Sequence, residues 1–185
     1  MEYLRLSWDD IEEQCGVLAK EIEERAVPFD IIIGIARGGW VPARILSDIL
    51  DNDDIHTVRV KFYESVGKTA KKPLILHPTQ IDIEGKDILL VDDIADTGES
   101  LIVTTRHLKE KKAENIFVVT LVKKPQSKFT PDLFVRETGD WVIFPWEINE
   151  TIRDIKARSD STEELQKEMK KAGLLYEYRR RDKGH

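Results

Sequence analysis

Short apolar runs alternate with helical patterns along most of this chain, and this alternation constrains the fold more than any other feature. Three runs rich in Ile, Leu and Val occupy Phe29–Ala36, Lys86–Asp93 and Asn115–Val122. Unbroken runs of this kind are typical of strands that are buried on both faces. Apolar residues at helical spacing fill the intervals, at Val41–Leu50 and from about Gly98 to Lys111. The pattern predicts an α/β domain in which a parallel sheet carries helices on both faces.

The rest of the chain adds elements to this plan. We expect a helix to begin near Trp8 and a strand to cover Ile55–Glu64. The segment Ser65–Glu84 has no clean period, and a stretch of about 20 residues without structure is typical of a functional lid or a hairpin. The late pieces DLFVRE and DWVIFPWE resemble short strands, and a further helix is predicted at Asp160–Gly173.

Composition limits the classes of protein to which this chain can belong. With 41% hydrophobic and 35% charged residues, the chain is expected to be soluble and globular. No apolar run approaches the roughly 18 residues of a membrane-spanning helix, and the start MEYLRLSWDD lacks the pattern of a secretory signal. The single cysteine, Cys15, excludes an internal disulfide and fits a reducing compartment. We therefore expect a cytoplasmic protein with no membrane partner.

Charge is unevenly distributed between the body of the chain and its end. The net charge of −6 argues against a nucleic-acid partner. Leu165–His185 carries seven Lys and Arg against three Asp and Glu, so the remainder has a charge of −10. A basic tail of this kind can pack on a partner subunit or contact nucleic acid, but a solvated or frayed terminus is the favoured interpretation.

Three acids crowd together after one of the apolar runs. Asp92 and Asp93 follow Ile88–Val91 directly, and Asp96 comes three residues later. Neighbouring carboxylates repel one another unless a cation or a hydroxyl-rich ligand lies between them. In a parallel sheet, ligands bind at the carboxyl ends of the strands, near the point where the strand order reverses. The pair is therefore predicted to hold vicinal hydroxyls, directly or through Mg²⁺.

The segment that begins at Asp96 is predicted to bind a phosphate monoester. It leads straight into a helix, so that the amides of the turn and of the first helical turn point outward together. Gly98 lets the backbone approach an anion, while Thr97 and Ser100 add hydroxyl donors. The chain has neither the P-loop motif nor G-x-G-x-x-G. Asp96 could instead serve only as the cap of this helix.

A second glycine-rich loop follows the first buried run. In ARGGW, Gly38 and Gly39 let backbone amides approach an anion, and Arg37 offers a guanidinium for bidentate contact with phosphate. Two anion-binding loops beside a pair of acids suit a ribose 5-phosphate. A response-regulator receiver domain also clusters acids, but its pair follows the first strand, whereas this pair follows the third.

These motifs resemble those of a known family, the type I phosphoribosyltransferases. ILLVDDIADTGES is similar to their phosphoribosyl-pyrophosphate signature, and GIARGGWVPARIL resembles their pyrophosphate loop. LSWDDIEEQCGVLAKEI, VKKP and DWVIFPWE further resemble the 6-oxopurine branch, closest to xanthine–guanine phosphoribosyltransferases. The resemblance covers about Leu4–Glu147. Ala95 departs from the larger aliphatic residue usual in the signature, which should only loosen packing.

For the sugar phosphate, the resemblance implies a role for each matching residue. Asp92 and Asp93 would hold the ribose hydroxyls and a Mg²⁺ ion, and Asp96 would lie near purine N7 as general base or electrostatic partner. Arg37 would stabilise the departing pyrophosphate, so the catalytic residues would be Asp96 and Arg37. The residues implied to bind phosphoribosyl pyrophosphate are Arg37, Gly38, Gly39, Asp92, Asp93, Asp96, Thr97, Gly98, Glu99 and Ser100.

For the purine base, the resemblance implies contacts from two later segments. Lys123 or Lys124 would donate to the 6-oxygen, and the sequence does not choose between them. Trp141 would stack on the base, and Val142 would contact its exocyclic edge through backbone atoms. Trp141 and Trp146 could alternatively be ordinary core aromatics.

Two further features are implied by the resemblance alone. The Ala36–Arg37 peptide bond is a candidate for the non-proline cis bond seen in relatives. The segment Ser65–Glu84 would be a flexible loop that closes over the transition state, with Tyr63 at its base and Lys68 within it.

We therefore predict a Mg²⁺-dependent purine salvage enzyme that transfers phosphoribosyl from phosphoribosyl pyrophosphate to hypoxanthine, guanine or xanthine. Residues 1–150 would form the transferase domain with a small C-terminal hood, and residues 151–185 a helical basic tail. Relatives imply a homo-oligomer, a dimer or larger. The alternative is a regulatory protein of the same fold that senses phosphoribosyl pyrophosphate or nucleotides without catalysis.

Overall fold

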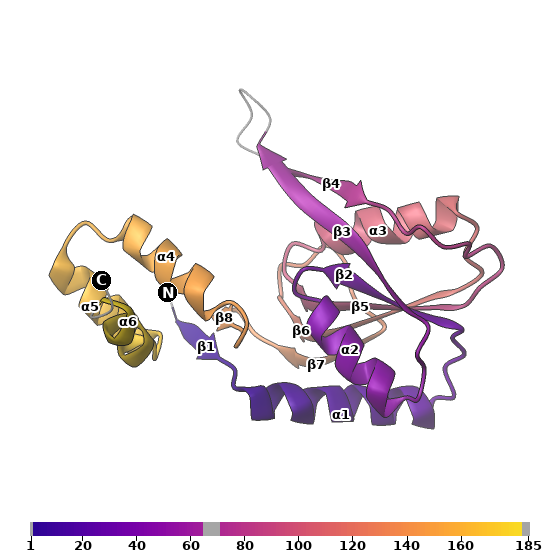
Figure 1. Cartoon of the computed structure of the whole chain (residues 1–185), viewed down its shortest axis with the longest axis horizontal. Coiled ribbons are helices and arrows are strands. Elements are labelled where there is room, and N and C mark those ends of the chain that lie inside the picture. Colours follow the sequence, from indigo (N-terminus) through magenta and orange to yellow (C-terminus); the bar gives the residue numbers. More distant parts are fainter. Residues whose placement is uncertain (1, 65–70, 183–185) are drawn as a thin grey trace. The chain divides into compact units, whose positions relative to one another are not determined.

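The computed structural model describes residues 2–64 and 71–182. Its larger sheet has the strand order β4-β3-β2-β5-β6-β7, and among these strands only β4 is antiparallel to its neighbour (Figure 1). The strands are β2 (Ile31–Ala36), β3 (Ile55–Glu64), β4 (Lys71–His77), β5 (Ile88–Ala95), β6 (Ile116–Lys123) and β7 (Leu133–Glu137). The predicted α/β class is confirmed.

Helices cover both faces of this sheet, which explains why its central strands are apolar without interruption. Figure 1 shows α1 and α2 on one face and α3 on the other; their bounds are Trp8–Glu24, Trp40–Ile49 and Glu99–Glu110. Ile31 and Ile33 belong to the core beneath α3, together with Leu101 and Leu108 of that helix. Ile32, between them, points to the opposite face and is fully buried.

The strand order reverses between β2 and β5. From β2 the chain moves to β3 on one side, and the next parallel strand, β5, pairs with the other side of β2. Gly34 lies opposite Val91 in this pairing, so the loop after Ala36 meets the end of β5. The two loops predicted to bind a ligand therefore leave the sheet at the reversal, where open α/β sheets form their ligand sites.

One correction concerns the segment Ser65–Glu84. Its middle part is strand β4, which forms an antiparallel hairpin with β3 and places Phe62 opposite Pro73. A proline is tolerated here because β4 is the edge strand of the sheet. The hairpin interpretation is confirmed for this part, and Lys68 lies outside the described residues.

Residues 2–10 and 139–182 form a second compact unit, which is separate from the unit of residues 11–138. It contains β1 (Tyr3–Arg5) parallel to β8 (Trp141–Ile143), and the helices α4 (Ile148–Arg158), α5 (Thr162–Lys171) and α6 (Leu175–Asp182). Its core consists of Ile143, Ile152, Ile155, Met169, Ala172 and Leu174.

The basic tail therefore contributes Met169, Ala172 and Leu174 to the core of this unit. The helix predicted at Asp160–Gly173 is confirmed as α5, whereas β1 was not predicted, and α4 and α6 were covered only by the general prediction of a helical tail. A frayed terminus is the wrong interpretation for residues 165–174, because Met169 and Leu174 are fully buried. The boundary at residue 150 stays a prediction. None of the helices in the described ranges, 2–64 and 71–182, has the length and apolar content needed to cross a membrane.

Candidate functional site

The glycine-rich loop after β2 lies directly against the acid pair of β5. Asp92 and Asp93 are 7% and 6% exposed near the end of that strand. A Cβ atom placed on Gly38 would lie 1.8 Å from Asp93 Oδ2, and one on Gly39 would lie 2.6 Å from the Val91 carbonyl oxygen. At position 39 only glycine fits, because an added Cβ would meet backbone atoms, while at position 38 an added Cβ would displace the Asp93 carboxylate. The ARGG loop and the VDD strand end are therefore in direct contact.

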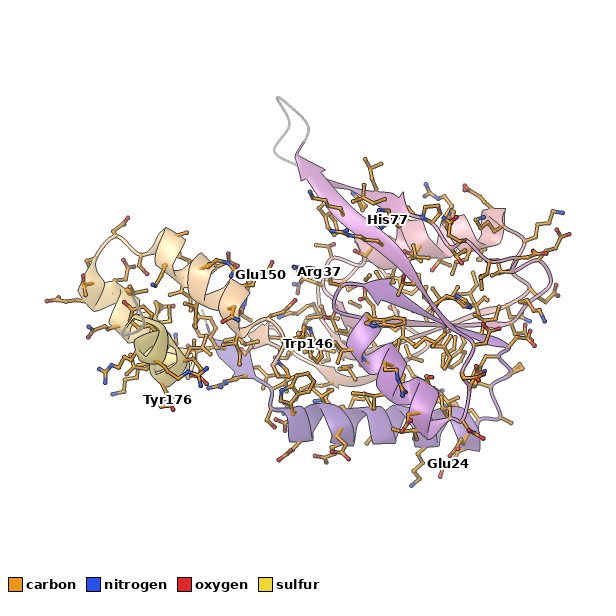
Figure 2. All side chains as sticks on the ribbon, in the orientation of Figure 1. Glu24, Arg37, His77, Trp146, Glu150 and Tyr176 are labelled. Atoms are coloured by element: carbon orange, nitrogen blue, oxygen red, sulfur yellow. The ribbon has the colours of Figure 1, made fainter. Side chains whose placement is uncertain are left out.

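Arg37 lies at the start of this loop. The Ala36–Arg37 peptide bond is cis, as the resemblance implied. The Arg37 side chain, labelled in Figure 2, is exposed. An exposed guanidinium next to a loop of glycine amides can bind an anionic group of a ligand.

The turn before α3 has the form of an anion site. Gly98 has a φ of 79°, in the left-handed region, and α3 begins at the next residue, Glu99. The Glu99 amide donates to Thr97 Oγ1 at 3.3 Å. The amides of the first helical turn have no partner within the helix and carry the positive end of its dipole, so they attract a phosphate group.

The loop after β6 closes over this turn. A Cβ atom on Gly98 would lie 2.6 Å from the Phe129 amide nitrogen and 2.8 Å from Ser127 Oγ. The Lys128 amide donates to the Thr97 carbonyl oxygen at 3.0 Å. Glycine is therefore required at position 98 for two reasons: the positive φ and the close approach of the loop after β6.

Asp96 is exposed at the top of the same turn, and its carboxylate has a partner. Gln126, from the loop after β6, donates from Nε2 to Asp96 Oδ1 at 3.1 Å. The N-cap of α3 is Gly98, and the side chain that accepts from the first amide of the helix is that of Thr97, not that of Asp96. Asp96 is thus not the cap of α3, which removes the simpler explanation for its position.

Comparison with known proteins agrees with this geometry. The model of the phosphoribosyl transferase domain family matches residues 7–151. The chain belongs to this family. A xanthine-guanine phosphoribosyltransferase of Gluconobacter oxydans is 32% identical over 149 residues, which cover 80% of this chain and 86% of the relative.

Solved structures agree as well. The purine phosphoribosyltransferase of Pyrococcus horikoshii Ot3 is 36% identical with a TM-score of 0.73, covering 79% of this chain and 95% of that chain. A Neisseria gonorrhoeae protein with bound ppGpp is 24% identical with a TM-score of 0.71, covering 85% and 98%, and shows the fold alone.

The two candidate lysines of this phosphoribosyl transferase differ in their surroundings. Lys123 ends β6, where its ammonium group pairs with Glu137 of β7 and lies 5.5 Å from the centre of the Phe134 ring. Lys124 is buried to 6% exposure, and its amide donates to the Ala95 carbonyl oxygen at 3.0 Å. The backbone of Lys124 is thereby fixed next to the strand end that carries the acids.

Trp141 and Val142 belong to the other unit. Trp141 is 44% exposed on β8, so it is not a core aromatic, while Val142 is buried. Trp146 is half-buried and stacks on Phe144 with 4.9 Å between ring centres. The roles of Trp141 and Val142 in binding the base stay predictions. Tyr63 lies in β3, and its side chain is outside the described part of the chain.

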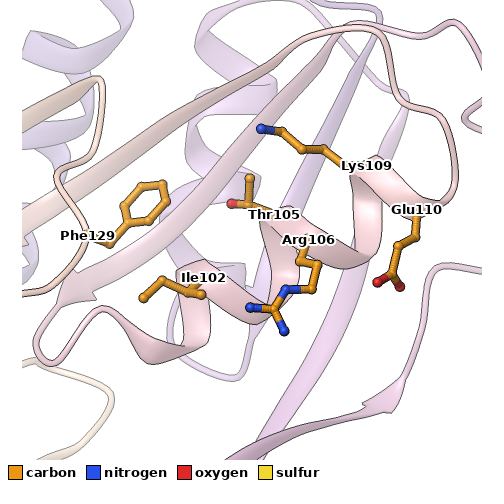
Figure 3. Close-up of a pocket in the computed structure, with 6 residues that line it drawn as sticks. All are labelled: Ile102, Thr105, Arg106, Lys109, Glu110 and Phe129. Carbon is orange, nitrogen blue, oxygen red and sulfur yellow. The ribbon is translucent and has the colours of Figure 1, made fainter.

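A surface pocket lies along α3, away from the acid pair. It has a volume of about 460 Å³ and is open to the surface between the helix and Phe129 (Figure 3). Its lining residues are Ile102, Thr105, Arg106, Lys109, Glu110 and Phe129. None of the residues predicted to bind phosphoribosyl pyrophosphate lines it. We assign it no ligand.

Sequence reasoning missed the contribution of the loop after β6. Gln126, Ser127 and Phe129 all contact the turn that carries Asp96 and Gly98. The segment QSKF, directly after VKKP, has no motif and no periodicity. Its contacts arise because β5 and β6 are adjacent and parallel, so the loops at their carboxyl ends lie side by side.

Proposed function

We propose that the chain is a Mg²⁺-dependent purine phosphoribosyltransferase that converts a 6-oxopurine and phosphoribosyl pyrophosphate to the nucleoside 5′-monophosphate and pyrophosphate. The observation that carries the proposal is the contact between the Gly38–Gly39 loop and the acids Asp92 and Asp93, beside the anion site of Gly98. The purine phosphoribosyltransferases among the similar proteins support the substrate class.

Each part of this site has a task in such a transfer. Asp92 and Asp93 accept hydrogen bonds from the ribose hydroxyls, while the amides and hydroxyls of Thr97–Ser100 hold the 5-phosphate. Arg37 and the glycine amides stabilise the negative charge that develops on the departing pyrophosphate. The carboxylates also stabilise the positive charge that the ribosyl group gains in the transition state.

The acid pair suits Mg²⁺ better than a metal that needs a full set of protein ligands. Within residues 2–64 and 71–182 no group of three or more His, Cys, Asp or Glu is placed to hold a metal ion. Mg²⁺ is commonly bound by one or two carboxylates together with substrate oxygens and waters. Asp92 and Asp93 would hold the ion, which would neutralise charge on the pyrophosphate group.

For the base, we propose Lys124 as the donor to the purine 6-oxygen. The Lys123 ammonium group is already paired with Glu137, and donating to the purine would break that ion pair. Lys124 is held by its backbone next to Ala95, one residue before Asp96. An ammonium group donates and cannot accept, so it favours an oxygen at position 6 over the amino group of adenine.

Assembly into a dimer or larger oligomer and a cytoplasmic location stay part of the proposal. Support for assembly comes from the start of α2, next to the glycine loop, where Trp40 is 37% exposed. Aromatic residues such as Trp are enriched at subunit interfaces. Light scattering of the purified chain would measure its mass, and a monomer at all concentrations would contradict the assembly.

Pyrophosphate release tests the function. Phosphoribosyl pyrophosphate and Mg²⁺ are supplied with hypoxanthine, guanine, xanthine or adenine in separate reactions. We expect turnover with at least one 6-oxopurine and little with adenine. Binding of phosphoribosyl pyrophosphate without turnover of any base would instead support the regulatory protein.

A further inference from the structure

The loop after β6 is fastened to the loop that carries Asp96 by backbone hydrogen bonds on both sides. The Lys124 amide donates to the Ala95 carbonyl oxygen, and the Lys128 amide donates to the Thr97 carbonyl oxygen, each at 3.0 Å. Ala95 and Thr97 flank Asp96 directly. The two loops are therefore held together, and Asp96 lies opposite the residues between Lys124 and Lys128.

Gln126 is the residue between these anchors that reaches Asp96. Its Nε2 donates to Asp96 Oδ1 at 3.1 Å, across 30 residues of sequence. The last torsion of an aspartate side chain is broad and roughly two-fold. A donor fixed on one oxygen therefore limits this rotation and holds the other oxygen in one direction.

We propose that Gln126 is a positioning residue for Asp96 in the transfer reaction, an inference that rests on the function proposed above. In that reaction the electron pair of purine N9 forms a bond to ribose C1′. The bond from C1′ to the pyrophosphate oxygen breaks, and its electron pair leaves with pyrophosphate. The proton on N7 passes to Asp96 Oδ2, while Gln126 holds Oδ1.

The same contact explains why a neutral amide stands at this position. A lysine or arginine would form an ion pair with Asp96 and compete with the purine proton for the carboxylate. A glutamate would repel it. An amide orients the carboxylate and adds no charge to a site that must also hold pyrophosphate and two further acids.

A merely structural role for Gln126 predicts a different result. The two loops are already joined by backbone bonds, and Gln126 is exposed, so its side chain contributes little to folding. A structural residue would change stability and substrate binding together. A positioning residue changes kcat, leaves the KM for phosphoribosyl pyrophosphate unchanged, and acts only when Asp96 is present.

The test compares Gln126→Met, which keeps the length but removes the donor, in the wild-type and the Asp96→Asn backgrounds. We expect kcat with the best 6-oxopurine to fall about tenfold in the wild-type background, since small misplacements of a reacting group reduce rates strongly. The KM for phosphoribosyl pyrophosphate should stay within about twofold. In the Asp96→Asn background the same substitution should change kcat less than about twofold, because coupled residues are not additive.

Two control variants make each outcome decisive. Gln126→Ala repeats the test with a smaller side chain, and Lys112→Met removes another exposed polar contact, that with Glu84 at 2.8 Å, without an expected effect on kcat. An unchanged kcat in both Gln126 variants overturns the inference alone. An equal fall in both Asp96 backgrounds overturns it too, because Gln126 would then act independently. If the wild-type protein turns over none of the bases, both the proposed function and this inference are overturned.

Discussion

The sheet carries acids at both ends of its strands, and the two ends use them differently. At the amino ends, the Asp87 amide donates to Asp30 Oδ2 at 2.9 Å, and Asn115 Nδ2 donates to Asp87 Oδ1 at 2.7 Å. These side chains tie together the starts of β2, β5 and β6. At the carboxyl ends, Asp92 and Asp93 are buried against a loop of glycines. Acids that join strands stabilise the fold, whereas acids packed under an anion-binding loop are arranged for a ligand.

The difference lies in what surrounds each carboxylate. Asp30 is exposed to water, which supports its charge without a ligand. Asp92 and Asp93 are adjacent and almost fully buried, an arrangement that stabilises a fold poorly unless cations or donors compensate it. Substitutions at the carboxyl ends should therefore affect activity more than stability, and substitutions at the amino ends should do the reverse.

The largest effect is expected for Asp96→Asn. The asparagine keeps the shape of the side chain but cannot take the N7 proton, and general bases contribute roughly 10²- to 10⁴-fold to rates. We expect kcat to fall at least about 100-fold, with the affinity for phosphoribosyl pyrophosphate largely unchanged. Steady-state kinetics and a binding titration would measure the two quantities. Wild-type turnover by this variant would contradict the role of Asp96 as base.

The next effect is expected for Gly38→Ala. The added Cβ would lie 1.8 Å from Asp93 Oδ2, so the carboxylate must move, and it can do so because it is the end of a side chain. We expect the KM for phosphoribosyl pyrophosphate to rise about tenfold, since the acid leaves its position, while the free energy of unfolding changes by less than about 1 kcal/mol.

Gly39→Ala is the matched variant. Its Cβ would meet the backbone of Val91 and Asp92 at 2.6 and 2.7 Å, where no side-chain rotation relieves the contact. It should lower the free energy of unfolding by about 1–3 kcal/mol. Equal stability losses in Gly38→Ala and Gly39→Ala, measured by urea unfolding, would contradict the distinction between the two contacts.

Local patterns explain why much of the fold could be predicted. The apolar runs locate β2, β5 and β6, because a strand covered on both faces must be apolar throughout. The turn of Asp96 and Gly98 was predicted as an anion site because its features lie within a few consecutive residues. The cis bond between Ala36 and Arg37 came from the resemblance alone and is present.

Elements with weak or distant signals were missed for physical reasons. Strand β4 contains Pro73 and exposes Leu74, so no alternation marks it. Helix α4 could have been predicted, because Ile148, Ile152 and Ile155 have helical spacing. The contact of Gln126 with Asp96 joins two loops through the sheet order, and a single sequence does not show which loops become neighbours.

A smaller effect is expected for Asp30→Ala at the amino ends. The substitution removes the acceptor of the Asp87 amide, and a hydrogen bond of this kind contributes about 1 kcal/mol to stability. We expect the free energy of unfolding to fall by about that amount, with kcat and KM unchanged. A loss of activity without a loss of stability would contradict the division between the two ends of the sheet.

Cys15 provides a measurement for this stability change. The thiol is fully buried in α1, and burial raises its pKa to about 12. It should react with a thiol reagent only when the chain opens, and about 1 kcal/mol lost in Asp30→Ala should raise the labelling rate roughly fivefold.

The stability of the chain should also depend on pH through Cys15. Because the pKa of the folded thiol is raised, its contribution to stability is complete below about pH 9 and is lost as the pH rises toward 12.

The smallest effect is expected for Gly16→Ala, which adds a methyl group where no atom lies within 4 Å apart from its chain neighbours and the nearby backbone of its own helix. Gly16 lies in the middle of α1, where glycine is less favourable than alanine by about 0.5–1 kcal/mol. The free energy of unfolding should rise by about that amount, labelling of Cys15 should slow, and kinetics should not change. Together with Gly38→Ala, this variant shows whether a methyl group harms the protein only where a glycine faces an acid of the site. An activity loss in Gly16→Ala would mean that glycine substitutions act through the fold as a whole, and the contrast between the ends of the sheet would lose its support.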